Sequence, residues 1–176
     1  MRKLIVATRP SHLAYTQTLQ AVSLLKERNP EYEFEVKKFS THGDRVTNQP
    51  LTSFGGTGVF VKELENAIAE GKADIAVHSL KDVPSNQPEG LILASFPQRE
   101  DPRDVVLTKG NIPLHELKDG CTIGTGSPRR ILQLMIHKPD AKFADLRGNI
   151  ETRIAKLMAG EYDAIVMAAA ALKRVQ

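Results

Sequence analysis

Short apolar runs alternate with amphipathic segments along the first half of the chain. Residues 4–7 and 75–77 are apolar and lead directly into polar residues, which is typical of buried strands in a parallel sheet. In residues 12–27 the polar side chains recur at helical spacing, and Ser11 precedes this segment as an N-cap. Residues 33–39 alternate and predict a second, more exposed strand. This pattern predicts an α/β unit.

The rest of the first half contains a helix, a strand and a long loop. A helix is expected from residue 59, with its apolar face continuing to Ile68 and Gly71 ending it. Residues 91–96 are apolar except for Ser95, which predicts another buried strand. Residues 40–58 are polar and rich in glycine. A long loop of this kind in a compact domain is usually functional or mobile, so we expect a lid over an active site.

The second half repeats the alternation of strands and helices. Residues 97–104 are polar and contain two prolines, so they predict the crossover between two domains. Ser127 as N-cap with Pro128 at the first helical position predicts the start of one helix, and Asn149 the start of another. Strands are expected at residues 105–107, 121–125, 143–146 and 162–170.

Composition narrows the class of protein. The 176 residues suffice for one large or two small α/β domains, and 41% hydrophobic with 26% charged residues is ordinary for a globular chain. The net charge of +3 is too small to indicate a nucleic-acid partner, and 5% aromatic residues without Trp leave few stacking platforms for bases. No apolar run approaches the length that spans a membrane. The amino terminus leads straight into a short strand, so we expect a cytoplasmic protein.

The single cysteine, Cys121, excludes an internal disulfide. No cysteine and histidine residues have the spacing of a zinc site, so no metal is expected. Cys121 begins an apolar strand, and we interpret it as a small buried hydrophobe.

The residues after the apolar run 75–77 are the first candidates for chemistry. His78, Ser79, Lys81 and Asp82 follow within five positions, and Pro84 prevents a regular continuation. In open α/β sheets ligands bind beyond the carboxyl ends of strands, which places these residues where sites usually form. A solvated turn with Asp82 as a local cap explains the spacing equally well.

Arginine residues recur at strand ends and helix starts. A cation there faces the positive end of the helix dipole, so its placement indicates an anion that the helix and the cation share. The rigid guanidinium fork suits carboxylates and phosphates, although solvated surface arginines remain an alternative. Asp82 is the one acidic group expected to face this set. The arginines are Arg9, Arg129, Arg130, Arg147 and Arg153.

Long motifs in this order resemble those of the porphobilinogen deaminase (hydroxymethylbilane synthase) family. The resemblance implies an α/β fold with two similar domains of the type II periplasmic-binding-protein kind and an active cleft between them. Domain 1 would comprise residues 1–98, without its returning segment, and domain 2 residues 99–176. The matching stretches are Gly43-Asp44 and residues 7–14, 60–64, 73–84, 99–104, 124–130, 146–149 and 162–174.

The resemblance also implies the chemistry. The family deaminates porphobilinogen and joins the pyrroles head to tail into hydroxymethylbilane, on a dipyrromethane cofactor held covalently by a cysteine. Asp82 matches the catalytic carboxylate, which would hold pyrrole N–H groups and handle protons. The expected enzyme is a monomer whose partner is the small-molecule substrate, with no nucleic acid or membrane. Residues matching those that bind the acetate and propionate groups are Arg9, Ser11, Lys81, Thr125, Ser127, Arg129, Arg130, Arg147 and Arg153.

Several positions depart from the family pattern. Thr57 stands where the family usually has lysine, Gly126 and Pro128 replace serine and leucine, and Ala171 replaces glycine. The family's third domain, with its cofactor-bearing cysteine, is absent from these residues, so we expect this chain alone to be inactive. A non-catalytic anion-binding module of the same fold is the alternative function.

Overall fold

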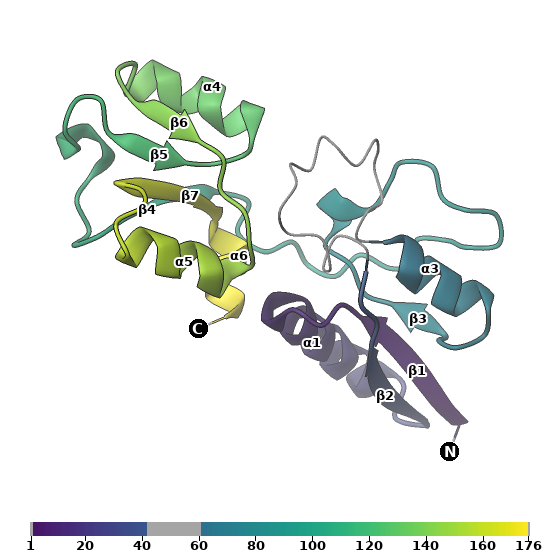
Figure 1. The fold of residues 1–176 in the computed structure, drawn as a ribbon. Helices are drawn as coiled ribbons and strands as arrows, with labels where there is room; N and C mark the ends of the chain where they lie inside the picture. Colours follow the sequence, from purple (N-terminus) through teal and green to yellow (C-terminus); the bar gives the residue numbers. More distant parts are fainter. Residues whose placement is uncertain (1, 42–60, 176) are drawn as a thin grey trace. The chain divides into compact units, whose positions relative to one another are not determined.

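The computed structural model describes residues 2–41 and 61–175, which form two compact α/β units (Figure 1). The first extends to Arg99, and the second comprises Glu100–Arg174. Most of the expected lid, residues 42–58, lies outside the described residues. Within the described part, no helix is both long and apolar enough to cross a membrane.

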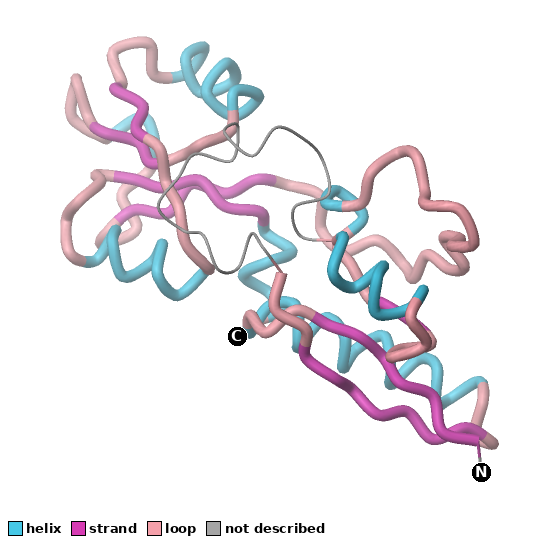
Figure 2. Tube along the Cα trace, turned by 45° about the vertical axis from the view of Figure 1, so that its right-hand side comes forward, coloured by secondary structure: helices cyan, strands magenta, loops and turns pink. Residues whose placement is uncertain are grey.

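The first unit has a parallel sheet of order β2-β1-β3 (Figure 2). The register pairs Val6 of β1 with Val36 of β2 and with Ile75 of β3. The strands near residues 4–7 and 33–39 and the helix after Ser11 are confirmed. The elements are β1 (Arg2–Thr8), α1 (His12–Arg28), β2 (Tyr32–Lys38), α3 (Lys62–Ala69) and β3 (Ile75–Ala76).

The core of the first unit lies on both faces of β1. Successive strand residues point to opposite faces, so Val6 and Ala7 serve different clusters. Val6 packs with Val22 of α1 and with Phe34, whereas Ala7 packs with Leu64 of α3 and its neighbours. The helices α1 and α3 therefore cover opposite faces of the sheet, as parallel strands require.

Two strand predictions in the first unit need correction. Residues 91–96 are not a buried strand: they have no regular structure, and Ile92 and Phe96 are 82% and 62% exposed. An apolar run forms a strand only beside a partner, and no strand among the described residues pairs with this one. The strand expected at residues 75–77 is reduced to β3, whose two residues are half-buried rather than buried.

The second unit has a mixed sheet of order β4-β7-β5-β6, in which only β4 runs antiparallel. The four strands predicted in this half are confirmed, but the last ends at Ala168 because α6 begins at the next residue. Its elements are β4 (Asp104–Thr108), β5 (Thr122–Gly124), α4 (Pro128–His137), β6 (Lys142–Ala144), α5 (Ile150–Met158), β7 (Ala164–Ala168) and α6 (Ala169–Arg174).

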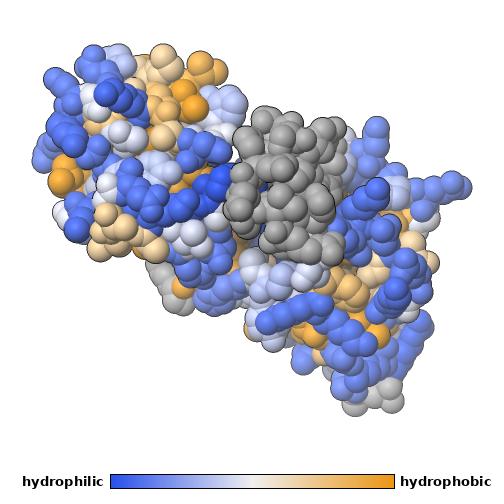
Figure 3. Space-filling model, in the orientation of Figure 1, coloured by the Kyte–Doolittle hydropathy of each residue, from blue (hydrophilic) through white to orange (hydrophobic). Residues whose placement is uncertain are grey.

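Cys121 lies in the core of the second unit. Its side chain is fully buried with Ile123, Leu134 and Val166, which confirms its interpretation as a small buried hydrophobe. The outer face of α4 stays apolar and exposed, and Figure 3 shows this hydrophobic surface over the helix. The exposed large hydrophobic residues of that helix are Leu132, Met135 and Ile136.

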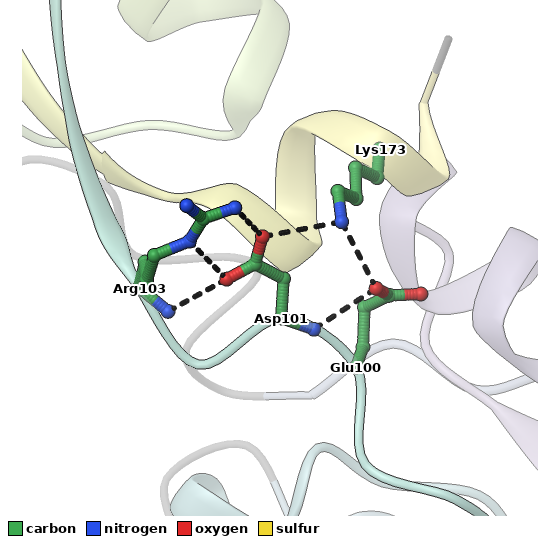
Figure 4. Close-up of polar contacts among 4 residues, drawn as sticks. All are labelled: Glu100, Asp101, Arg103 and Lys173. Atoms are coloured by element: carbon green, nitrogen blue, oxygen red, sulfur yellow. Dashed lines mark hydrogen bonds and ion pairs between the residues drawn. The ribbon is translucent and has the colours of Figure 1, made fainter.

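An ionic network attaches the start of the second unit to α6 (Figure 4). Asp101 accepts hydrogen bonds from the Arg103 guanidinium at 2.9 and 2.6 Å and from the Arg103 backbone N–H at 3.1 Å. Lys173 Nζ lies 3.1 Å from Asp101 and 3.5 Å from Glu100. The Arg103 guanidinium holds the pKa of the Asp101 carboxyl well below its ordinary value, so this network stays ionised down to acidic pH.

Candidate functional site

Asp82 lies in η2 (Leu80–Asp82), a short 3-10 helix that follows β3. The backbone N–H of Asp82 donates to the Ser79 carbonyl at 2.9 Å. Gln17 of α1 fixes the preceding residues, because its Nε2 donates to the His78 carbonyl at 3.3 Å and its Oε1 accepts from Ser79 Oγ at 2.8 Å. The turn that carries Asp82 is therefore held by α1.

Burial controls the charges of this turn. Burial raises the pKa of the Asp82 carboxyl above its ordinary value, although the charges of Lys81 and Arg9 oppose this. Burial also lowers the pKa of His78 to about 4, and the Arg9 guanidinium adds to the effect. Among the described residues, His78 Nε2 is buried without a hydrogen-bond partner. A carboxyl whose pKa is raised by burial, four residues after a neutral imidazole, is suited to proton transfer.

The first unit thus brings together Arg9, Lys81 and Asp82 of the predicted set. Arg9 and Lys81 both act on the Asp82 charge. Ser11 is confirmed as the N-cap of α1, since its Oγ accepts from the Ala14 N–H at 3.4 Å. Its hydroxyl is therefore partly used by the helix.

The second unit presents the start of α4 beyond the end of β5. Ser127 is at the N-cap position and Pro128 follows, as predicted, but the hydroxyl of Ser127 makes no capping bond within the described residues. The Ser127 N–H instead donates to Thr125 Oγ1 at 3.2 Å. Thr125 is buried, and its N–H donates to the Ala144 carbonyl at 2.9 Å. The Ser127 hydroxyl is therefore available to a ligand.

Asp104 binds both arginines at the first turn of α4. Arg129 Nη2 and Arg130 Nη2 donate to its two carboxylate oxygens at 2.7 and 2.6 Å. Burial opposes ionisation of Asp104, but the hydrogen bonds from Arg130 and Arg129 outweigh it and lower the pKa. The expectation that Asp82 is the one acid facing the arginines is therefore wrong. The sequence signal missed is strand direction: β4 is antiparallel, so its first residue lies at the edge where β5 and β7 end.

Arg147 and Arg153 follow β6 and extend the cationic group. Arg153 Nε donates to the Gly148 carbonyl at 2.8 Å, and Asn149 caps α5 as predicted by accepting from the Thr152 N–H at 2.9 Å. Burial lowers the pKa of Arg153, and the charges of Arg130 and Arg147 add to this. These charges therefore lie close enough to repel one another.

Two guanidinium donors of this group are buried without a partner among the described residues. They are Arg130 Nε and Arg147 Nη1. Arg130 uses its other nitrogens on Asp104 and on the Val166 carbonyl, at 2.6 and 3.1 Å. Buried polar groups are normally hydrogen-bonded, so unpartnered charged donors indicate the place of an anionic ligand. Within residues 2–41 and 61–175, no three histidine, cysteine, aspartate or glutamate side chains are grouped so that they could hold a metal ion.

Comparison with solved structures agrees with the fold. The periplasmic VFT2 domain of Bordetella pertussis BvgS matches with a TM-score of 0.50 at 19% identity, over 96% of this chain and 66% of that domain chain. The F375E/Q461E double mutant of the same domain matches with a TM-score of 0.52 at 19% identity, over 98% of this chain and 67% of that chain. The chain therefore has an α/β fold like that of periplasmic binding proteins.

Sequence comparison identifies the family. The family model "Porphobilinogen deaminase, dipyromethane cofactor binding domain" matches residues 4–176. The porphobilinogen deaminases of Macrococcus caseolyticus and Bacillus subtilis are 51% and 48% identical over 175 residues, 99% of this chain. The chain spans 57% and 56% of the length of these two relatives. It belongs to the porphobilinogen deaminase family.

Proposed function

We propose that this chain carries the proton-handling and carboxylate-binding residues of a porphobilinogen deaminase. The reaction is the deamination of porphobilinogen and its head-to-tail condensation into hydroxymethylbilane, a step of haem biosynthesis. The observation that carries the proposal is the pair of buried, unpartnered guanidinium donors, Arg130 Nε and Arg147 Nη1. An acidic pyrrole supplies the carboxylates that such donors require.

Asp82 is the proposed acid–base group. Its raised pKa, caused by burial, lets the carboxyl hold a proton at higher pH than an exposed aspartate does. In its ionised form the carboxylate accepts hydrogen bonds from pyrrole N–H groups and stabilises positive charge that develops on a pyrrole. Gln17 supports this role, because it fixes the turn that carries Asp82.

The arginines of the second unit fit the carboxylates of a dipyrromethane cofactor. Arg130, Arg147 and Arg153 would hold its acetate and propionate groups, with the Ser127 hydroxyl as an additional donor. When bound, the cofactor supplies the primer to which further pyrroles are joined. Its covalent attachment requires an accessible thiol, and Cys121 is fully buried, so this cysteine does not serve.

A binding experiment tests the arginine assignment. Titration calorimetry with porphobilinogen compares the chain with Arg147→Lys, in which a point charge replaces the fork. Loss of a charged hydrogen bond of about 1.5–3 kcal/mol predicts roughly ten- to 150-fold weaker binding. Arg28→Lys, at the exposed end of α1, is the matched control and should bind like the parent chain. Equal affinities for all three proteins would refute the assignment.

A turnover experiment separates the enzyme from a non-catalytic anion-binding module. In the complete gene product, Asp82→Asn keeps the shape of the side chain and removes its charge. Formation of hydroxymethylbilane should fall by orders of magnitude while porphobilinogen still binds. Near-normal turnover would exclude Asp82 as the acid–base group, and absence of turnover in the parent protein would favour the binding module. The cytoplasmic location and the monomeric state stay predictions.

A further inference from the structure

The carboxylate of Asp145 occupies the space of a missing side chain. The strands β5 and β6 run parallel with Gly124 opposite Ala144, so the residues that follow them lie side by side. A Cβ atom added to Gly126 would overlap Asp145 Oδ1 and lie 3.6 Å from Asp145 Cγ. The absence of a side chain at position 126 therefore leaves room for this carboxylate between Thr125 and Ser127.

The backbone of Asp145 is held in place, and its charge acts on Arg153. The Tyr162 hydroxyl donates to the Asp145 carbonyl at 2.8 Å, which fixes the backbone at this point. The negative charge of Asp145 favours the charged form of Arg153, whereas Arg130 and Arg147 disfavour it. Asp104 is already bound by Arg129 and Arg130, so the two acids differ in role. Asp145 is exposed and acts on the charge of Arg153, as do Arg130 and Arg147, which carry the unpartnered donors.

We propose that Asp145 is a specificity-determining residue that acts as a resident anion beside the arginine cluster, with Gly126 providing its space. The inference deepens the proposed function, because it concerns the same carboxylate-binding arginines. A fixed negative charge repels every anionic ligand, and the repulsion grows with the charge of the ligand. Asp145 therefore weakens the binding of multiply charged anions most, and favours ligands whose carboxylates are spread over separate positions.

The main test measures anion affinity with Asp145→Asn, which keeps the shape of the side chain. Sulfate and acetate are the probes, measured by titration at low ionic strength because salt screens the effect. We expect affinity to rise roughly three- to tenfold per unit of ligand charge, hence more for sulfate than for acetate. Asp145→Glu keeps the charge and should resemble the parent chain. If Asp145 were needed only for structure, Asp145→Asn would lower the anion affinity. The direction of the change therefore separates a structural role from that of a resident anion.

A second variant tests the part played by Gly126. Gly126→Ser places a side chain in the space of the carboxylate and displaces it, so sulfate affinity should rise. The same substitution in the Asp145→Asn background should have little further effect, which a double-mutant cycle measures. Glu116→Gln, an exposed acid on η3 (Leu114–Glu116) of the same unit, is the control and should change nothing.

The outcomes distinguish this inference from the proposed function. Higher sulfate affinity in Asp145→Asn without any binding of porphobilinogen supports the resident anion and refutes the proposed substrate. Porphobilinogen binding that loses strength in Arg147→Lys, with unchanged anion affinity in Asp145→Asn, supports the substrate and overturns the resident anion. Failure of both the parent chain and Asp145→Asn to bind sulfate overturns it as well.

Discussion

Acidification should destabilise the first unit through His78. Burial and the Arg9 charge lower its pKa from 6.5 to about 4 in the folded protein. Protonation therefore favours the unfolded chain, in which the imidazole has its ordinary pKa. The stabilisation from the neutral imidazole is fully present above pH 6.5, and it is lost as the pH falls from 6.5 towards 4.

The magnitude follows from the two pKa values. At pH 5 an unfolded histidine is almost entirely protonated and His78 in the folded chain almost entirely neutral, which lowers the free energy of unfolding by about 2 kcal/mol relative to neutral pH. Contact of the imidazole with solvent screens the effect, so the measured value should lie between about 1 and 2 kcal/mol. Asp82 acts in the opposite direction because its pKa is raised, and comparison with a His78 variant removes its contribution.

Two measurements check this prediction. Proton NMR of the histidine ring signals should show one of the chain's five histidines titrating near pH 4, and His78→Gln should remove that signal. Urea unfolding at pH 7.5 and pH 5 should show a smaller loss of stability for His78→Gln than for the parent chain. His115→Gln, whose side chain is 80% exposed, is the control and should leave the pH dependence unchanged. A His78 signal that titrates near pH 6.5 would refute the reasoning.

Three further predictions concern the charge of Asp82, the backbone at Gly148 and the thiol of Cys121. Asp82→Asn should raise the urea midpoint at pH 7 and leave it unchanged near pH 3. Because the pKa of Asp82 is raised in the folded state, ionising this carboxyl above pH 3.8 lowers the stability of the folded chain. Gly148→Ala should destabilise the chain by about 1–3 kcal/mol, since φ is +110° and the new Cβ would lie 2.7 Å from Thr152 Cγ2. Gly160→Ala, at φ +82° with no described atom within 4 Å of a Cβ, should cost less, and equal losses would exclude the clash. Cys121 should react with a thiol reagent only after unfolding, and the intact mass of the native chain should match the bare sequence; an adduct of dipyrromethane size would contradict its burial.

Local signals made several elements readable from the sequence. The helix starts after Ser11 and Asn149 rest on side chains that accept hydrogen bonds from an N–H three residues further on. Pro128 begins α4 because its ring already has the required φ and its missing N–H is not needed there. These interactions lie within one helical turn, so the residues that make them are neighbours in the sequence as well as in space.

Strand formation depends on partners that the pattern of a segment does not contain. Residues 75–76 and 91–96 are both apolar, but only the first pair with β1. The apolar run shows that burial is favourable, whereas the hydrogen bonds that make a strand come from another segment. The spacing of hydrophobic residues therefore distinguishes a strand from a helix, but it does not show which apolar run pairs with another strand.

The arginines were expected to form a charged site, and the structure decided which acids oppose them. Asp104 reaches Arg130 because an antiparallel strand starts where parallel strands end, and Asp145 approaches Gly126 because β5 and β6 end side by side. Gln17 holds Ser79, 62 positions away, by the packing of a helix against a sheet. The sequence by itself determined the helix starts, because the capping interactions that set them join neighbours along the chain. The pairing of charges was decided only by the tertiary structure, because strand order and direction set the distances between residues far apart in the sequence.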